Sequence, residues 1–95
     1  VSNAAYLDGL GESVGELRRY ILDSLRRGDF SRCDELLSIM EEIYGVLITM
    51  DFPELLAHGL RRTTDNMRGI IERTRGDLTV SLRQKSLEAK FDDLS

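Results

Sequence analysis

The sequence has few of the residues that build β-sheets or cross-link a chain. Its 95 residues include no tryptophan, one proline and one cysteine, and aromatic side chains make up only 6%. Aromatic residues are enriched in strands, so their shortage argues against a sheet protein. The single cysteine, Cys33, permits no disulfide within the chain. Together with the single histidine, His58, it provides too few ligands for a zinc site.

A long apolar run is also lacking. No segment approaches the ~18–20 apolar residues of a membrane span, and none resembles a secretory leader. We therefore expect a soluble, intracellular protein of the cytoplasm that does not contact a membrane. The residues that are present, 41% hydrophobic and 32% charged, have the composition of a globular chain. A chain of 95 residues suits one domain or part of one.

The charges are unevenly distributed. The formal net charge of −4 does not by itself indicate nucleic-acid binding. Residues 1–50 hold nine acids and five arginines, whereas residues 61–90 hold eight bases and four acids. A basic strip of this kind can hold phosphates, although a solvated helix face is its more common cause, and both interpretations stay open. The candidate nucleic-acid-binding residues are Arg19, Arg62, Arg73 and Arg75.

Apolar residues recur three or four positions apart in three segments, which predicts helices at about 4–27, 30–50 and 53–91. The first helix should end at Gly28, which suits a left-handed cap, and the second should begin near Asp29 or Ser31. The second helix has the widest apolar stripe, so we expect it to be the most deeply buried. The short connections predict an all-α antiparallel bundle in a single domain, 1–95.

Some apolar residues widen the stripes beyond what two partner helices can cover. They are Leu22, Leu37, Ile48 and Leu55. Burying such a side chain is worth about 1.5–3 kcal/mol. We therefore expect the chain to dock against further helices or against other subunits in an oligomer.

Two acids on the first helix are candidate metal ligands. At 100° per residue, Glu12 and Glu16 lie almost opposite the apolar stripe, with their carboxylates one turn apart. Like charges so placed repel one another unless a cation or a proton lies between them. Two such carboxylates provide half of a Mg²⁺ or Mn²⁺ site, because these ions prefer oxygen ligands. The alternative is an ordinary solvated face on which Arg19 neutralises Glu16.

Three glycines in the same helix need an explanation. Gly9, Gly11 and Gly15 each cost about 1 kcal/mol of helix propensity relative to alanine. A helix that is merely solvated gains nothing from them. Close approach of another backbone, or of a nucleic-acid strand, would account for them.

The run "AYLDGLGESVGELRRYILDSLRRGDFSRC" resembles the translin family, specifically the branch related to translin-associated factor X. The resemblance is carried by the Tyr6-Leu7-x-Gly9 opening, the Gly15-Glu16-Leu17 step and the turn from Gly28 to Arg32. It is clear from Ala4 to about Pro53, including "MEEIYGVL", and weaker beyond.

The resemblance implies an all-α protein that binds single-stranded RNA or DNA and assembles into homo-oligomers or hetero-oligomers with translin-like subunits. It also implies that the factor X branch supplies a Mg²⁺-dependent endoribonuclease whose paired catalytic acids fall here on Glu12 and Glu16. The family's usual first acid is Asp, so Glu12 is a longer variant. Plain translin subunits have an apolar residue there, which favours the catalytic branch.

The family's additional acids and its basic segment lie on an earlier helix that does not appear in this sequence. We therefore expect the chain to correspond to the C-terminal half of a larger translin-type fold and to be inactive by itself. A non-catalytic single-stranded nucleic-acid-binding scaffold of the same family is the alternative. A helical interaction module without nucleic acid is a third hypothesis.

Overall fold

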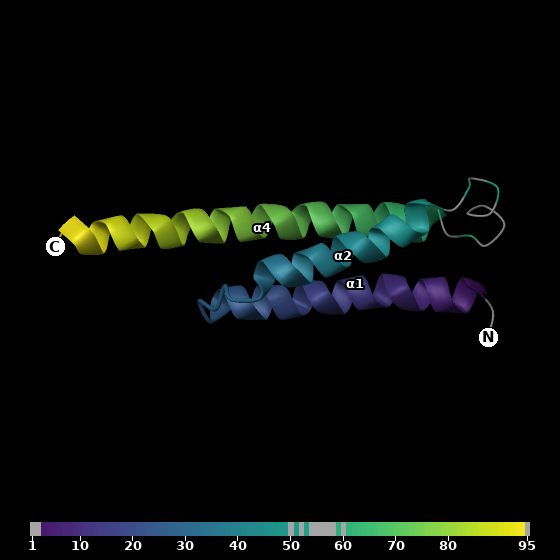
Figure 1. Cartoon of the computed structure of the whole chain (residues 1–95), viewed down its shortest axis with the longest axis horizontal. Helices are drawn as coiled ribbons and strands as arrows, with labels where there is room; N and C mark the ends of the chain where they lie inside the picture. Colours follow the sequence, from purple (N-terminus) through teal and green to yellow (C-terminus); the bar gives the residue numbers. More distant parts are fainter. Residues whose placement is uncertain (1–2, 50, 52, 54–58, 60, 95) are drawn as a thin grey trace.

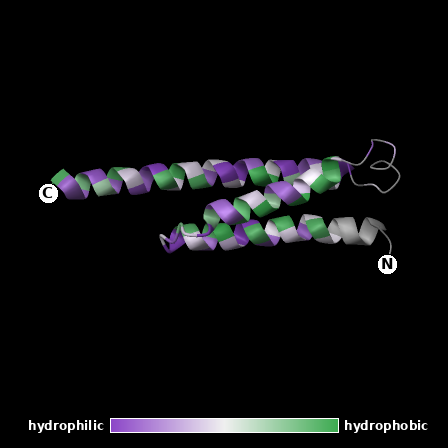
Figure 2. Ribbon diagram, in the orientation of Figure 1, coloured by the Kyte–Doolittle hydropathy of each residue, from purple (hydrophilic) through white to green (hydrophobic). Residues whose placement is uncertain are grey.

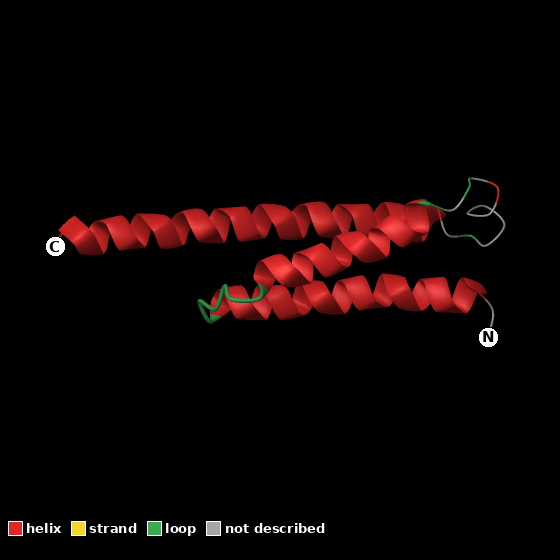
Figure 3. Ribbon diagram, viewed as in Figure 1, coloured by secondary structure: helices red, strands yellow, loops and turns green. Residues whose placement is uncertain are grey.

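The computed structural model describes residues 3–49, 51, 53, 59 and 61–94, with side chains from residue 9 onward. This part of the chain forms three helices, α1 (Asn3–Arg26), α2 (Cys33–Ile48) and α4 (Arg61–Leu94), and contains no strand. Figures 1 and 3 show that α2 runs antiparallel to both α1 and α4. The predicted all-α antiparallel bundle is therefore confirmed. No helix in the described ranges has both the length and the apolar character needed to cross a bilayer.

The end of α1 follows from Gly28. This glycine has a φ of +73°, a left-handed conformation that costs glycine little. The Gly28 N–H donates to the Leu25 carbonyl at 3.1 Å, and the Asp29 N–H donates to the Ser24 carbonyl at 2.9 Å. These two bonds form a Schellman motif, which satisfies carbonyls that the end of a helix would leave unpaired. The predicted helix end is confirmed.

The start of α2 differs from the prediction. The helix begins at Cys33, and its N-cap, Arg32, makes no side-chain capping bond. Ser31 is used in the preceding turn, where its N–H and its hydroxyl both donate to Asp29 Oδ1, at 3.1 and 2.6 Å. These bonds hold the pKa of the Asp29 carboxyl below its usual value. Ser31 therefore closes the turn between the helices rather than capping the second one.

The helix predicted from residue 53 is not continuous, although Pro53 itself is helical. Gly59 has a φ of +65°, which an α-helix cannot accommodate, and α4 begins only at Arg61. Most of the connection, residues 52, 54–58 and 60, lies outside the described residues, and with it His58. From Arg61 the helix continues for 34 residues to Leu94, so that its C-terminal turns extend past the other two helices (Figure 1).

The core lies between the three helices, and Figure 2 shows that hydrophobic residues recur along each of them. Its buried hydrophobic residues are Val14, Ile21, Cys33, Leu36, Leu37, Met40, Leu47, Met67, Ile71 and Leu78. Half of them belong to α2, which confirms that this short helix is the most deeply buried. Burial raises the pKa of the Cys33 thiol and so disfavours its reactive thiolate.

The residues that suggested an oligomer differ in how far the structure buries them. Leu37 is buried within the three helices, so its interpretation as a surplus apolar residue was wrong. Leu22 is half-buried, and Ile48 is exposed over 53% of its surface. Leu55 lies outside the described residues. Within the described part of the chain, Ile48 is the member of this set that still offers a substantial apolar surface.

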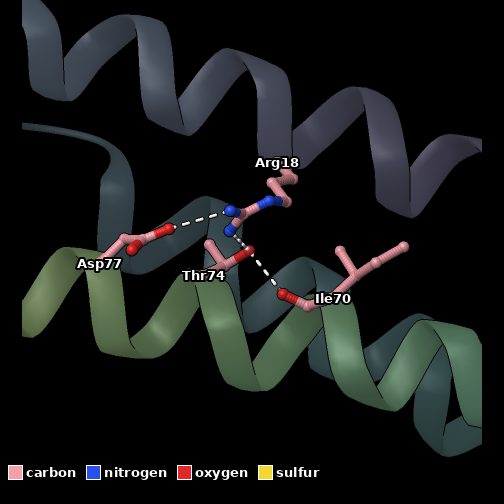
Figure 4. A network of polar contacts seen from close by, with 4 residues as sticks. All are labelled: Arg18, Ile70, Thr74 and Asp77. Carbon is pink, nitrogen blue, oxygen red and sulfur yellow. Dashed lines mark hydrogen bonds and ion pairs between the residues drawn. The ribbon is translucent and has the colours of Figure 1, made fainter.

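A polar network ties α1 to α4 (Figure 4). The Arg18 guanidinium donates to Thr74 Oγ1 and to Asp77 Oδ2, both at 2.9 Å. The Thr74 hydroxyl in turn donates to the Ile70 carbonyl at 2.7 Å. Thr74 is fully buried and the Arg18 side chain is only 22% exposed. These charge-assisted bonds, one to a buried hydroxyl and one to a half-exposed carboxylate, fix how α1 is rotated and positioned along α4.

The first prediction uses two adjacent arginines. Replacing Arg18 by Met should lower the free energy of unfolding by about 1–3 kcal/mol, because buried Thr74 loses a partner and the ion pair is broken. Urea unfolding followed by circular dichroism measures this change. Arg19→Met is the matched control, because Arg19 pairs with exposed Glu16 and the loss of this pair should cost less than about 1 kcal/mol. Equal losses of unfolding free energy in the two variants would show that the network does not hold α1 on α4.

Candidate functional site

Glu12 and Glu16 line one groove between α1 and the start of α2. The groove has a volume of about 690 Å³ and is also lined by Gly9, Ser13, Leu17, Tyr20, Arg32 and Leu36. Both glutamates are exposed, so the groove is open to solvent. Glu12 also lines a depression of about 390 Å³ between α1 and α4, which includes Gly11, Thr63, Asn66, Met67 and Ile70. Glu12 therefore stands between two hollows, and Glu16 lies in one of them.

Glu16 already has a cationic partner. The Arg19 guanidinium lies 3.3 Å from its carboxylate, and both side chains are more than 70% exposed. This is the neutralisation that the sequence offered as the alternative to a metal. An exposed ion pair contributes only about 0.2–1 kcal/mol, so a divalent cation can displace it at little cost.

The two carboxylates suit a loosely held Mg²⁺ ion. Within the described residues no group of three or more His, Cys, Asp or Glu side chains is placed to hold a metal. Mg²⁺ usually keeps several waters and takes one or two carboxylates together with substrate phosphates. Glu12 and Glu16 fit that pattern, because they offer hard oxygen ligands that face solvent. They do not form a closed protein cage.

The glycines of α1 have different surroundings. A Cβ on Gly11 would lie 2.9 Å from Thr63 Cγ2, so Gly11 allows α4 to approach α1 closely. The close neighbour at Gly11 is thus a side chain of α4, not the backbone or nucleic-acid strand that the sequence analysis predicted. A Cβ on Gly9 or Gly15 would meet no atom within 4 Å. Nothing in the described residues explains these two glycines, and Gly9 lies in the groove beside the glutamates.

The candidate arginines fall into two groups. Arg19 is paired with Glu16, and Arg75 donates to Glu41 across the α2–α4 interface. Arg62 and Arg73 are exposed and form no ion pair with any other residue that the structure describes. Their spacing of 11 residues places them on one side of α4, opposite its buried face. The structure does not bring them into either groove that contains Glu12.

Two residues of the groove were missed by the sequence analysis. Tyr20 is 48% exposed and lies one turn beyond Glu16 on the same face of α1. Arg32 enters the groove from the start of α2 and pairs with Glu35 at 3.4 Å. The spacing of Glu12, Glu16 and Tyr20 was a signal for the tyrosine. No local pattern points to Arg32, because its position depends on how α2 packs on α1.

Two known proteins resemble the chain in sequence. A chain of a solved structure described as the AfC3PO–duplex RNA complex is 44% identical, with a TM-score of 0.79 over 88% of this chain and 44% of the other. An uncharacterized protein of Methanocaldococcus jannaschii, MJ0175, is 32% identical over 82 residues, covering 86% of this chain and 36% of the relative. No protein-family model matches.

The structural match confirms the translin-type helical fold. It supports the translin-like family without distinguishing the factor X branch. The chain spans less than half the length of either relative, so most of each relative lies outside the matched region.

The second prediction separates the glycines by stability. Gly15→Ala should raise the free energy of unfolding by up to about 1 kcal/mol, because alanine is the better helix former and the new methyl group meets open space. Gly11→Ala should gain less or lose stability, because its methyl group would press on Thr63. Thermal unfolding of both variants measures the difference. An equal gain in both would contradict the close α1–α4 contact.

Proposed function

We propose that this chain forms the C-terminal part of a translin-type RNA-binding protein, of the branch related to translin-associated factor X. We further propose that the complete protein is a metal-dependent endoribonuclease that hydrolyses phosphodiester bonds. The activity would require an N-terminal helical segment and an oligomer of identical or translin-like subunits. This chain alone would then be inactive.

The observation that carries this proposal is the placement of Glu12 and Glu16 in one solvent-open groove. It is supported by the 44% identity to a chain that was solved in complex with duplex RNA. The sequence pointed to single-stranded RNA or DNA, so the choice between single strands and duplexes stays a prediction. Glu12 favours the catalytic branch, because plain translin subunits have an apolar residue at that position.

Several residues in and beside the groove have a proposed role in the reaction. Glu12 and Glu16 would hold the Mg²⁺ or Mn²⁺ ion, which would compete with Arg19 for Glu16. A metal held there would supply the Lewis-acid chemistry that polarises a phosphate and activates water for attack. Arg32 contacts a neighbouring phosphate, and the exposed ring of Tyr20 stacks on a base. The bare backbone at Gly9 lets the nucleic-acid strand lie close to the glutamates.

The third prediction tests the acid pair. In the complete protein, Glu12→Gln combined with Glu16→Gln should slow RNA cleavage about 100-fold or more, because electrostatic stabilisers of this kind contribute ~10²–10³ to kcat. Titration calorimetry with Mn²⁺ should show correspondingly weaker metal binding. Glutamine preserves side-chain size, so the fold should be retained.

Asp23→Asn serves as the control for this double variant. Asp23 is exposed on the same side of α1 but pairs with Arg26 and lies outside both grooves that Glu12 lines. Its cleavage rate should therefore match that of the wild-type protein. Unchanged cleavage in the Glu12/Glu16 double variant would remove the nuclease assignment.

A non-catalytic scaffold that binds single-stranded nucleic acid is the second candidate function. The Arg19–Glu16 ion pair and the absence of a third metal ligand among the described residues favour it. The two candidates differ in one assay. A scaffold binds RNA but leaves it intact in the presence of either Mg²⁺ or Mn²⁺.

The fourth prediction concerns Arg62 and Arg73, which form no ion pair with another described residue. If Arg62 and Arg73 contact phosphates, replacing both by Ala should weaken single-stranded RNA binding. The slope of log K against log salt should shrink in magnitude by about 1.4, since each contact with a single strand contributes ~0.7. Arg68→Ala is the control, because Arg68 is paired with Glu72 at 3.2 Å. An unchanged slope in the double variant would exclude these arginines from the RNA contact.

A further inference from the structure

A third hollow lies at the far end of α1, away from the two hollows that Glu12 lines. Its volume is about 450 Å³, which is within the range of small-molecule pockets. The last turn of α1 and the turn after it form one wall, and the second half of α4 forms the other. The polar lining includes Arg26, Arg27 and Gly28 on the first wall and Ser81, Gln84 and Lys85 on the second. Glu12 and Glu16 line other hollows, so this end hollow is a separate place on the molecule.

Arg27 and Lys85 bring two positive charges to the end hollow. Neither forms an ion pair with any other residue in the described part of the chain. A cation in the last turn of a helix interacts favourably with the helix dipole, which accounts for Arg27 on its own. It does not account for Lys85, which reaches the same hollow from α4. The two like charges repel each other across the hollow, and an anion between them would replace this repulsion by attraction.

Uncharged contacts orient both cations. Arg27 Nη2 donates to Ser24 Oγ at 3.4 Å, and Ser24 is buried. Lys85 Nζ lies 4.6 Å from the centroid of the Phe30 ring, which is a cation–π contact. These contacts place the guanidinium and the ammonium at the hollow but do not neutralise their charges.

The acids around the end hollow differ in their effect. Asp23 pairs with Arg26 at 3.1 Å, so Arg26 is already neutralised. Asp29 is near the hollow too, but its Oδ1 accepts both bonds from Ser31. Glu88 lines the hollow itself and has no ion-pair partner among the described residues. Because Glu88 would repel an anion, its removal is a direct test of the charge of the ligand.

A phosphomonoester fits these groups better than a phosphodiester. It carries a charge of about −1.5 to −2 at pH 7 and offers three acceptor oxygens. It can therefore accept bonds from Arg27, from Lys85 and from a neutral donor, Ser81 or Gln84, at the same time. A phosphodiester has a single charge and two free oxygens, which would leave part of the hollow without a partner.

We propose that the end hollow binds a terminal phosphate group, whether of inorganic phosphate, of a nucleotide or at the end of a nucleic-acid strand. Arg27 and Lys85 bind two of its oxygens from opposite walls, and Ser81 or Gln84 contacts the third. Glu16 lies about 16 Å from Arg27 along the axis of α1, so the end hollow and the glutamate groove bind different groups. The inference does not rest on the proposed nuclease activity, and binding requires no metal.

Titration calorimetry of the complete protein in EDTA tests the site, with adenosine monophosphate as the probe. The wild-type protein should bind it, and Lys85→Gln should raise the Kd at least about tenfold, because a charge-assisted bond is lost. Arg83→Gln is the matched control, since Arg83 is an exposed base of α4 that does not line the hollow, and it should leave the Kd unchanged. A wild-type protein that does not bind the probe, or an unchanged Kd in Lys85→Gln, would overturn the proposal.

Glu88→Gln should lower the Kd for adenosine monophosphate, because it removes a charge that repels the phosphate. Glutamine has nearly the same size as glutamate, so the shape of the hollow should be retained. A Kd that stays the same or rises in this variant would show that the phosphate does not enter the end hollow.

Further probes identify the source of the phosphate. A dinucleotide whose only phosphate is a phosphodiester should bind at least about tenfold more weakly than adenosine monophosphate, and equal binding would overturn the choice of a terminal phosphate. Inorganic phosphate, and one RNA oligomer with and without a terminal phosphate, complete the series. The natural source corresponds to the probe with the lowest Kd that Lys85→Gln raises.

The acid pair of the glutamate groove separates this proposal from the nuclease. In EDTA, Glu12→Gln combined with Glu16→Gln should leave the Kd for adenosine monophosphate unchanged, whatever its effect on RNA cleavage. A changed Kd in this double variant would place the nucleotide in the glutamate groove and overturn the end hollow as its site.

Discussion

The close contact between α1 and α4 is the constraint on which the rest of the structure depends. At one point the absence of a side chain at Gly11 lets Thr63 approach, and two turns further along Arg18 reaches buried Thr74 and Asp77. These two contacts fix the rotation of α1 about its axis. With the apolar stripe turned inward, Glu12 and Glu16 must face outward on the side toward the start of α2.

The candidate site is consequently a surface groove built mostly from one helix. Its acids can meet a hydrated cation without the cost of burying charge, and the cation must compete only with the exposed Arg19. The same openness means that these carboxylates hold a metal incompletely. A phosphate and further ligands would have to complete the shell, which is consistent with a site assembled from more than one segment or subunit.

The predictions that succeeded relied on local periodicity. The stripe of Val14 and Ile21 is buried as its spacing indicated, and Gly28 ends α1 with the expected left-handed conformation. The predictions failed where a residue could take either of two local structural roles. Ser31 has the type of a helix cap but closes a turn with Asp29, and Gly59 interrupts a segment whose apolar spacing continues a helix. Periodicity does not distinguish between such roles, because both are compatible with the same short-range pattern.

The sequence by itself determined that the chain is helical, the face that α1 buries and the one-turn spacing of Glu12 and Glu16, because all of these depend on neighbours within about four residues. Only the tertiary structure decided that Tyr20 and Arg32 share the groove with the glutamates. It also decided that Arg75 forms an ion pair with Glu41, while Arg62 and Arg73 face away from that groove. These relations join different helices, so they depend on the angle and rotation at which the helices pack. That geometry is set by the fit of the whole core rather than by any one segment.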